Sequence, residues 1–522
     1  MIRTSLSDPL RIDFITLASS GARIGMSMCP GKQTSETSWS LPWERDLETD
    51  IKAIADWGAT ALVSLITEHE FEWVNVVELP QIAQRHGLEW HHLPITDMRA
   101  PDERFETRWL YSGKRLRTLL TAGRHLALHC MGGLGRTGTI AARLMVELGD
   151  TPEHAISRVR SARRGTIQTP DQESHVYRCE AVAAPGAATS YGDRVLGCLL
   201  GGAVGDAFGA LIEFENMETI YQRFGAQGLL DPCKLAAQLQ VSDDTQMTMF
   251  TLEGLLRAQN ADQGVALQSI RESYLDWLAT QIPVPHRQLA GRIASDPLLR
   301  QRRCPGTTCL SGLAAGGDGS PEAPLNDSKG CGAAMRVAPV GLFPRWFDVR
   351  AAFELGVMSG ALTHGHPDAY YPAGAMAAMV RQLIAGVDLR EATHAVIDLL
   401  SEREQSAQTI AALRCALHEV EQMEPDCPTV IGRLGLGWSG HEALAIALYA
   451  ALRGASFAQV IAIAANHSGD SDTTAALAGQ LYGAWRGVSD LPHRWVSSLD
   501  VQDPLLGLTR QLIQTCPDVV IV

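Results

Sequence analysis

His129-Cys130-Met131-Gly132-Gly133-Leu134-Gly135-Arg136-Thr137-Gly138-Thr139 is the stretch of sequence that decides the fold of the N-terminal part of the chain. It follows an apolar run and precedes a helical pattern, so it predicts a strand, a glycine-rich loop and a helix in succession. Its cysteine stands six residues before its arginine. A helix N-terminus offers N–H groups and a positive dipole, which favour both a thiolate and a bound phosphate. The stretch therefore predicts a cysteine nucleophile at a phosphate site.

The other residues of this loop suit the same chemistry. Gly132, Gly133 and Gly135 let the backbone curve around an anion without Cβ clashes. The guanidinium of Arg136 can hold two phosphate oxygens. The Thr137 hydroxyl can donate to the sulfur when the thiolate leaves. We therefore expect the three glycines to bind the substrate and Arg136 and Thr137 to take part in catalysis.

A phosphoenzyme route also needs a proton for the leaving group and a positioned water. Asp97 and Asp102 lie in a loop just after a predicted strand, and either carboxyl can supply the proton. Gln168 and Gln172 can orient the water that hydrolyses the phosphocysteine. The residues alone leave the choice between the two aspartates open.

Working outward from the loop, the first 180 or so residues alternate strand-like and helix-like segments, as α/β domains do. The patterns predict helices over 46–57 and 139–148 and strands over 61–66, 89–95 and 125–129.

The segment His129–Thr137 matches the HCx5R[ST] signature of protein tyrosine and dual-specificity phosphatases. Within that superfamily the region most resembles the cyclin-dependent-kinase-inhibitor-associated type, which has a similar HCxGGLGRS loop and a P-I-x-D acid loop. By this resemblance Cys130 is the nucleophile, Arg136 the phosphate clamp and Asp97 the general acid. Gln168 and Gln172 correspond to the family's glutamine pair. No cofactor is expected in this domain.

At 522 residues the chain is too long for one ordinary core, so we expect two domains. A small-residue segment with a proline, assigned to residues 183–191, reads as a linker between domains 1–182 and 192–522. After it the sequence turns to long Ala/Leu-rich helical segments, and residues 304–328 read as a long loop. The predicted fold is an α/β phosphatase domain with a central sheet, followed by an all-α domain.

Two acidic clusters stand far apart in the second domain, VSDDTQM at residues 241–247 and NHSGDSDTT at residues 466–474. Adjacent carboxylates repel unless cations or hydrogen bonds compensate. Oxygen ligands without clustered Cys or His favour Mg²⁺, Mn²⁺ or Ca²⁺ over zinc. Taken singly, either cluster can also be no more than a capped helix start.

Three further segments accompany the clusters: LLGGAVGDAFG at residues 199–209, KGCGAAMR at 329–336 and ALTH at 361–364. In this order the five segments resemble the ADP-ribosylglycohydrolase family, over residues 190–500 or so. The resemblance implies a compact all-α domain with two Mg²⁺ or Mn²⁺ ions. By this resemblance the metal ligands are Ser242, Asp243, Asp244, Asp470, Asp472 and Thr473, with Asp472 as the bridging carboxylate.

The same resemblance implies the residues that contact the ADP-ribose. They are Glu213 on a flap over the ribose, Gly332, Met335 and Arg336 in a loop, and His364 near the pocket. Asp243 or Asp470 can deprotonate the attacking water.

Three further positions bear on the second site. Trp438 either packs near the adenine or belongs to the core. Cys331 stands where many relatives have Asn, which bears on the substrate loop. His366, close to His364, suggests pocket lining or a structural role and not zinc binding.

The composition sets limits on partners and location. A net charge of −14 argues against general nucleic-acid or acidic-membrane binding. Eleven cysteines are too few for a disulfide scaffold and indicate a reducing compartment. No signal-peptide pattern or apolar run of membrane-spanning length is present, so we expect a cytoplasmic location. We also expect the protein to be a monomer.

These observations predict a bifunctional hydrolase: a cysteine-dependent phosphatase joined to a metal-dependent ADP-ribosylglycohydrolase. Its expected partners are an ADP-ribosylated protein or other conjugate and a phosphorylated protein or metabolite. The alternative is a single-activity ADP-ribosylglycohydrolase in which the phosphatase-like domain is a phosphate-binding targeting module.

Overall fold

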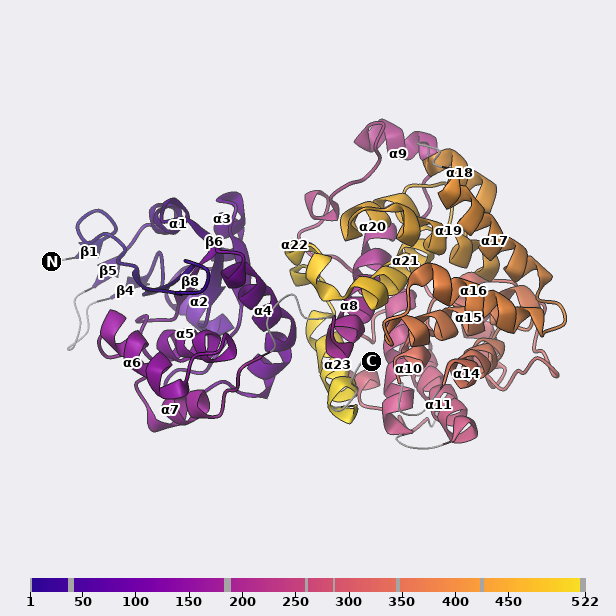
Figure 1. Ribbon diagram of the computed structural model, residues 1–522, viewed down its shortest axis with the longest axis horizontal. Coiled ribbons are helices and arrows are strands. Elements are labelled where there is room, and N and C mark those ends of the chain that lie inside the picture. Colours follow the sequence, from indigo (N-terminus) through magenta and orange to yellow (C-terminus); the bar gives the residue numbers. More distant parts are fainter. Residues whose placement is uncertain are drawn as a thin grey trace. The chain divides into compact units, whose positions relative to one another are not determined.

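The computed structural model describes residues 2–35, 42–182, 189–258, 262–284, 287–343, 348–422 and 427–516. Its internal contacts divide the chain into two units, residues 1–187 and 188–522, which are coloured indigo to magenta and magenta to yellow in Figure 1. Most of the predicted linker, residues 183–188, lies outside the described residues.

The first unit is built on a five-stranded sheet of order β2-β3-β8-β6-β7, in which only β2 runs antiparallel to its neighbour. Short strands β1, β5 and β4 form a second sheet. The strands are β1 (Arg3–Thr4), β2 (Asp13–Thr16), β3 (Arg23–Ser27), β4 (Gln33–Thr34), β5 (Trp43–Glu44), β6 (Ala59–Ser64), β7 (Glu89–His92) and β8 (His125–His129).

The described residues of this unit form seven helices around the central sheet, with α1 and α3 on one side of it and α5, α6 and α7 on the other (Figure 1). They are α1 (Leu47–Asp56), α2 (Glu68–Trp73), α3 (Leu79–Arg85), α4 (Glu103–Thr121), α5 (Gly135–Glu147), α6 (Pro152–Ala162) and α7 (Pro170–Tyr177). The predicted α/β domain with a central sheet is confirmed, and β8 has the predicted bounds. Helix α5 begins at Gly135 of the glycine-rich loop, four residues earlier than predicted.

The second unit is helical, as predicted. Its described residues pair as β-structure only in two isolated bridges, Leu239 with Leu499 and Gly330 with Ser439. Its α-helices are α8 (Tyr191–Gly209), α9 (Met217–Phe224), α10 (Asp243–Arg257), α11 (Gln263–Gln281), α12 (Thr307–Ala314), α13 (Ala338–Gly341), α14 (Val349–Ala361), α15 (Pro367–Leu383), α16 (Leu389–Ser401), α17 (Ala407–Glu421), α18 (Cys427–Leu434), α19 (Gly440–Arg453), α20 (Phe457–Ala465), α21 (Ser471–Arg486), α22 (His493–Ser497) and α23 (Gln502–Thr515).

One sequence prediction for this unit is wrong in part. Residues 304–328 were expected to form a continuous loop, but they contain the two-turn helix α12. The small, glycine-rich residues of this segment have low helix propensity, so the sequence pattern did not indicate the helix. Burial of Cys309 and Leu313 stabilises it instead.

Helices α8 and α21 pack almost backbone to backbone, and this contact positions the acidic residues of the second unit (Figure 1). A Cβ on any of four α8 glycines spaced four residues apart would lie within 2.5 Å of a carbonyl oxygen of α21, so only glycine allows this approach. These glycines are Gly197, Gly201, Gly205 and Gly209. The C-terminal end of α8 thereby meets the N-terminal end of α21, where the second acidic cluster lies.

No helix among the described residues is both long enough and apolar enough to cross a membrane.

Candidate functional sites

The structure places Cys130 at the carboxyl end of β8, immediately before the glycine loop and α5, with 3% of its surface exposed. The loop can curve this tightly because Gly133 has a φ of +71°, and a Cβ there would lie 2.2 Å from the Ser27 carbonyl oxygen. A Cβ on Gly135 would meet the amide oxygens of Gln168 and Gln172 at 2.7 and 2.9 Å. Gly132 has no such neighbour.

Arg136 is 1% exposed and is held from two sides. Its Nη1 and Nη2 donate to Oε2 and Oε1 of Glu70 at 2.7 and 2.9 Å, and Nη1 also donates to the Ile95 carbonyl oxygen at 3.0 Å. Burial raises the pKa of Glu70, but hydrogen bonds from Arg136 and Thr67 outweigh it and hold that pKa below its usual value. Glu70 is therefore an ionised carboxylate that orients the guanidinium. The sequence patterns did not single it out.

The two candidate acids have different surroundings. Asp97 Oδ1 lies 2.9 Å from Arg136 Nη2, and its side chain is 66% exposed. Asp102 is the N-cap of α4 and accepts a hydrogen bond from the Phe105 N–H at 2.9 Å. The structure thus brings Asp97 to the arginine and uses Asp102 as a helix cap.

The remaining predicted residues of this site lie around the loop. Gln168 Oε1 accepts a hydrogen bond from the Gly135 N–H at 3.0 Å, and Gln172 Oε1 accepts one from the Gln168 N–H at 2.9 Å. The Thr137 hydroxyl is buried and makes no hydrogen bond with the described residues.

A cavity of about 290 Å³ adjoins this loop. Arg11, Arg163 and Arg164 are among its lining residues, together with Met28 and Asp13. Arg163 donates to the loop carbonyl of Gly132 at 3.1 Å and pairs with Asp13 at 2.7 Å, whereas Arg164 is exposed. Because β3 and β8 are parallel with Ser27 opposite His129, Met28 follows at the same sheet edge as Cys130.

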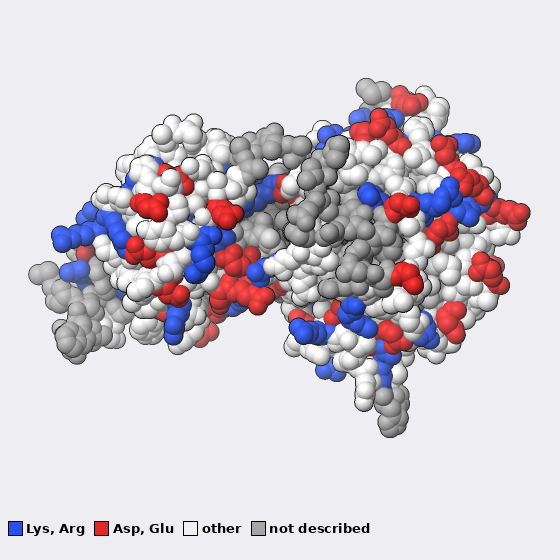
Figure 2. Space-filling view, turned by 60° about the horizontal axis from the view of Figure 1, so that its bottom comes forward, with Lys and Arg blue, Asp and Glu red and all other residues white. Residues whose placement is uncertain are grey.

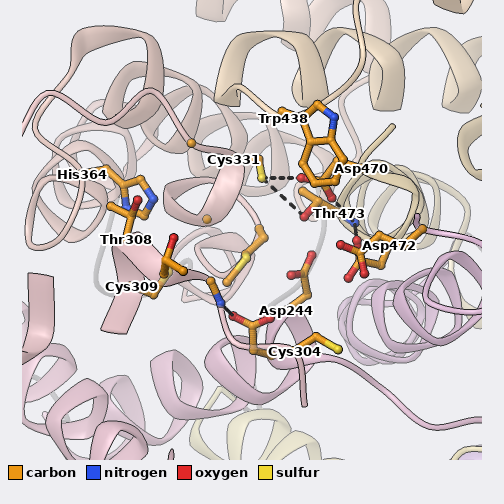
Figure 3. A pocket seen from close by; sticks show the side chains of 17 residues that line it. Asp244, Cys304, Thr308, Cys309, Cys331, His364, Trp438, Asp470, Asp472 and Thr473 are labelled. Atoms are coloured by element: carbon orange, nitrogen blue, oxygen red, sulfur yellow. Dashed lines mark hydrogen bonds between the residues drawn. The ribbon is translucent and has the colours of Figure 1, made fainter. Parts of the chain in front are cut away.

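The second unit contains a cavity of about 230 Å³ in which most of the predicted ADP-ribosylglycohydrolase residues meet (Figure 3). Its lining includes residues from α10, α12, α21 and the loops before α13 and α19. The predicted residues that line it are Glu213, Asp243, Asp244, Gly332, Met335, His364, Trp438, Asp470, Asp472 and Thr473.

Carboxylates dominate one wall of this cavity. The ligand oxygens of Glu213, Asp470 and Asp472 all lie within 4.8 Å of one another. Burial, followed by repulsion from Asp470, raises the pKa of Glu213 to about 8, and burial raises that of Asp243 to about 7. Among the described residues no lysine or arginine lines this cavity, so nothing in its lining balances the charge.

Hydrogen bonds fix several of these carboxylates. Asp243 Oδ2 accepts from the Gly306 N–H at 3.0 Å, and Asp470 Oδ1 caps α21 through the Thr473 N–H at 3.3 Å. Asp244 is 3% exposed, and its Oδ2 accepts no hydrogen bond from the described part of the chain. Burial and the neighbouring carboxylates raise the pKa of Asp244 well above its usual value. A buried carboxylate oxygen without a partner is costly unless a cation occupies the space beside it.

A buried aspartate that was not predicted supports the first cluster. Asp206 of α8 accepts hydrogen bonds from the backbone N–H groups of Ser242 and Thr245 at 2.9 and 3.0 Å. Ser242 does not line the cavity; it is the N-cap of α10, and its Oγ accepts from the Asp244 N–H at 3.2 Å.

Arg336 is likewise not brought to the cavity. It is fully buried, donates to Thr363 Oγ1 at 2.7 Å and lies 4.4 Å from the centre of the Tyr274 ring. His364, which does line the cavity, is hydrogen-bonded to the same threonine at 2.8 Å. Burial lowers the pKa of His364 to about 3, so its imidazole is neutral.

Two aromatic rings stand at the rim. Phe214 is 77% exposed, and its ring stacks on that of Trp438 with centroids 6.4 Å apart. Trp438 is therefore a rim residue and not a core tryptophan. Thr307, Thr308 and Cys309, which open α12, also line the cavity although the sequence had assigned them to a loop.

Comparison with known proteins agrees with this geometry. Residues 187–519, well over half of the chain, match the family described as ADP-ribosylglycohydrolase. The chain belongs to the ADP-ribosylglycohydrolase family. The ADP-ribosyl-[dinitrogen reductase] glycohydrolase of Rhodospirillum rubrum is 28% identical over 326 residues, which cover 59% of this chain and 91% of that protein.

The N-terminal unit matches a different family. Residues 43–176 match the DSP-PTPase phosphatase domain of Swiss Army Knife proteins. Cyclin-dependent kinase inhibitor 3 of Homo sapiens is 29% identical over 174 residues, covering 32% of this chain and 78% of that protein. The solved structure of a kinase associated phosphatase is 27% identical and covers 32% of this chain and 93% of that chain, with a TM-score of 0.29. Both domains thus belong to hydrolase families.

The family is metal-dependent, and the residues present fit a divalent cation. The donor set is carboxylate and hydroxyl oxygen, which suits Mg²⁺ or Mn²⁺. The unpaired Asp244 oxygen and the raised pKa values are what a cation site shows without its cation.

Proposed function

We propose that this chain is a bifunctional hydrolase that removes ADP-ribose from a modified substrate and phosphate from a phosphorylated one. The observation that carries the first activity is the wall of buried carboxylates around the 230 Å³ cavity. The observation that carries the second is Cys130 at the start of a glycine loop whose arginine is buried and doubly held. The two sites belong to different units, so each activity can be tested separately.

Asp243, Asp244, Asp470 and Asp472 would hold two Mg²⁺ or Mn²⁺ ions, with the Thr473 hydroxyl as a further oxygen ligand. Ser242, which was predicted as a ligand but lies outside the cavity lining, would instead hold Asp244 in place from the N-cap of α10. When bound, these ions would bind the ribose hydroxyls and orient a water. Asp243 or Asp470 would take the proton of that water as its oxygen bonds to the ribosyl anomeric carbon. The bond from that carbon to the leaving nitrogen or oxygen breaks, and the leaving group is protonated.

Other residues of the cavity would position the substrate. Glu213, Gly332, Met335 and His364 line the cavity and would contact the ADP-ribose. Arg336 would act indirectly as a positioning residue, because it donates a hydrogen bond to Thr363 and the same threonine is hydrogen-bonded to His364.

In the first unit the Cys130 thiolate would attack phosphorus, and the bond from phosphorus to the leaving oxygen would break. Asp97 would give its proton to that oxygen, and Arg136 would stabilise the charge on the phosphoryl group. Because Asp97 now pairs with Arg136, an incoming phosphate would displace it from the guanidinium. A water oriented by Gln168 and Gln172 would then attack the phosphocysteine, with the Thr137 hydroxyl donating to the departing sulfur.

The families and the pockets support the proposed substrates. The relative from Rhodospirillum rubrum acts on an ADP-ribosylated protein, which supports a protein substrate for the glycohydrolase. Arg11 and Arg163 pair with Asp13 in the cavity beside the phosphate loop, whereas Arg164 is exposed there. Arg164 therefore supports a phosphorylated substrate with a second anionic group, either on a protein or on a metabolite. All eleven cysteines are free, which supports a cytoplasmic location.

The test is a panel of defined ADP-ribosyl conjugates, linked through arginine nitrogen, serine oxygen or a base, each assayed with Mg²⁺, with Mn²⁺ and with EDTA. We expect ADP-ribose release from at least one conjugate and none with EDTA. Release that survives EDTA would contradict the metal centre. Phosphate binding without release of phosphate from an aryl phosphate would instead make the first unit a targeting module.

A further inference from the structure

Three cysteines, Cys304, Cys309 and Cys331, line the carboxylate cavity, and one of them touches a carboxylate directly. Cys331 Sγ lies 2.7 Å from Asp470 Oδ2 and 3.7 Å from Thr473 Oγ1 (Figure 3). Both neighbours belong to the proposed oxygen ligands. A sulfur atom therefore stands at the edge of a site that was expected to offer oxygen only.

The backbone fixes this sulfur in place. The Cys331 N–H donates to the Trp438 carbonyl oxygen at 3.1 Å, and the neighbouring Gly330 forms a β-bridge with Ser439. The Cys331 carbonyl accepts the N–H groups of Ala334 and Met335 at 2.8 and 3.2 Å. Because the main chain is tied on both sides, the thiol is directed toward Asp470 by the fold and not by a mobile loop.

The same cavity contains an oxygen with no partner. Asp244 is 3% exposed and lines the cavity with Cys331, and its Oδ2 accepts no hydrogen bond from the residues that the structure describes. The cavity thus contains both a thiol and an unsatisfied carboxylate oxygen. This mixed donor set suits borderline and soft cations better than it suits Mg²⁺.

We propose that this metal centre also accepts a thiophilic divalent cation, Zn²⁺ or Cd²⁺, with Cys331 Sγ and Asp470 as neighbouring ligands. This inference rests on the proposed metal centre. Binding breaks the S–H bond, releases the proton to solvent and forms a bond from sulfur to the metal. No electron is transferred, so no oxidant or reductant is needed.

The required movement is small. With bonds of about 2.3 Å to sulfur and about 2.1 Å to oxygen, the two ligand atoms stand roughly 3.1 Å apart at a 90° angle and roughly 3.6 Å apart at the tetrahedral angle. They now lie 2.7 Å apart, so they have to separate by about 0.4 to 0.9 Å. A modest rotation of one side chain is enough. The ion is then bound to the Asp470 carboxylate, so it should compete with Mg²⁺ for the site.

The test is a Cd²⁺ titration of the intact chain, followed by the ultraviolet absorption band that a cadmium–thiolate bond produces. We expect the band in the unmodified chain and its loss in Cys331→Ser, with Cd²⁺ affinity reduced about 10- to 100-fold or more. Cys304→Ser is the matched control, because Cys304 lines the same cavity without a hydrogen bond to a carboxylate oxygen among the described residues. It should keep the band. The Mg²⁺-induced rise in unfolding temperature reports whether Cys331→Ser still folds and binds a hard cation.

The outcomes separate this inference from the proposed function. A band that persists in Cys331→Ser, or that vanishes in Cys304→Ser, overturns the inference. The same is true if the unmodified chain shows no band while Mg²⁺ still raises its unfolding temperature and supports ADP-ribose release. If ADP-ribose release fails but Cd²⁺ still gives a band that requires Cys331, the proposed function is wrong and the thiophilic site stands.

Discussion

Replacing Asp472 by asparagine should stabilise the cation-free second unit and remove most of the stabilisation that a divalent cation gives. Oxygens of Glu213, Asp470 and Asp472 lie within 4.8 Å of one another. At an effective dielectric constant of about 20, two ionised carboxylates at that distance repel by about 3.5 kcal/mol. Asparagine has nearly the same shape but no charge, so it removes two of these three repulsions.

Part of the repulsion is already relieved in the cation-free protein. The pKa of Glu213 is raised to about 8, and burial followed by repulsion from Asp244 and Asp470 raises the pKa of Asp472 well above its usual value. We therefore expect Asp472→Asn to stabilise the cation-free second unit by about 1–3 kcal/mol, which raises its unfolding temperature by roughly 2–6 °C. In the unmodified chain, Mg²⁺ at 100 times its Kd should stabilise this unit by about 2.7 kcal/mol. The variant should lose most of that gain.

The assay is thermal unfolding of the intact chain in EDTA and in excess Mg²⁺, following the transition that responds to Mg²⁺. Asp398→Asn on the exposed side of α16 is the matched control and should change neither curve. The reasoning is refuted if Asp472→Asn lowers the unfolding temperature in EDTA, or if it keeps the full Mg²⁺ response.

Three further predictions concern the first unit. Asp97→Asn should lower the rate of aryl phosphate hydrolysis about 10²- to 10⁴-fold. Asp102→Asn should leave the rate unchanged because asparagine caps α4 equally well. Equal losses in the two variants would contradict the assignment of Asp97 as the acid. Glu70→Gln should destabilise the first unit by about 2 kcal/mol, because it weakens charge-assisted hydrogen bonds to Arg136. Since the folded pKa of Glu70 is depressed, this difference in denaturant unfolding should be full above about pH 5 and fade as the pH falls through that pKa; a difference that grows in acid would contradict it. Arg164→Ala should raise KM about two- to fivefold for a substrate with a second phosphate and not for a simple aryl phosphate; an equal effect on both would argue against a second anion beside the loop.

The phosphate loop could be predicted from the sequence because strand, loop and helix are contiguous there. Each residue type in that stretch is required by local geometry, as the position of Gly133 against Ser27 shows. Glu70 could not be predicted in the same way. It comes from α2, and nothing in its own surroundings in the sequence indicates that it meets Arg136 across the fold.

The second site shows the same division. The acidic clusters and the glycine spacing of α8 were visible, and the structure brings most of the implied residues to one cavity. Ser242 and Arg336 were implied by resemblance alone, and the structure places both outside the lining of that cavity. Asp206 belongs to a quoted motif, but its role appears only when α8 lies beside the start of α10.

The thiol beside Asp470 illustrates what a pattern cannot show. A single cysteine in a glycine-rich segment usually packs as a small apolar residue. The two β-bridge partners, Gly330 and Ser439, are more than one hundred residues apart, and only their pairing directs Cys331 toward the carboxylate.

The most direct test of the central claim measures both activities on one set of preparations: the unmodified chain, Cys130→Ser and Asp472→Ala. Phosphate release from an aryl phosphate and ADP-ribose release from a conjugate that the unmodified chain cleaves are followed side by side. We predict that Cys130→Ser loses only phosphate release and that Asp472→Ala loses only ADP-ribose release. Full phosphate release by Cys130→Ser, or full ADP-ribose release by Asp472→Ala, would contradict the account.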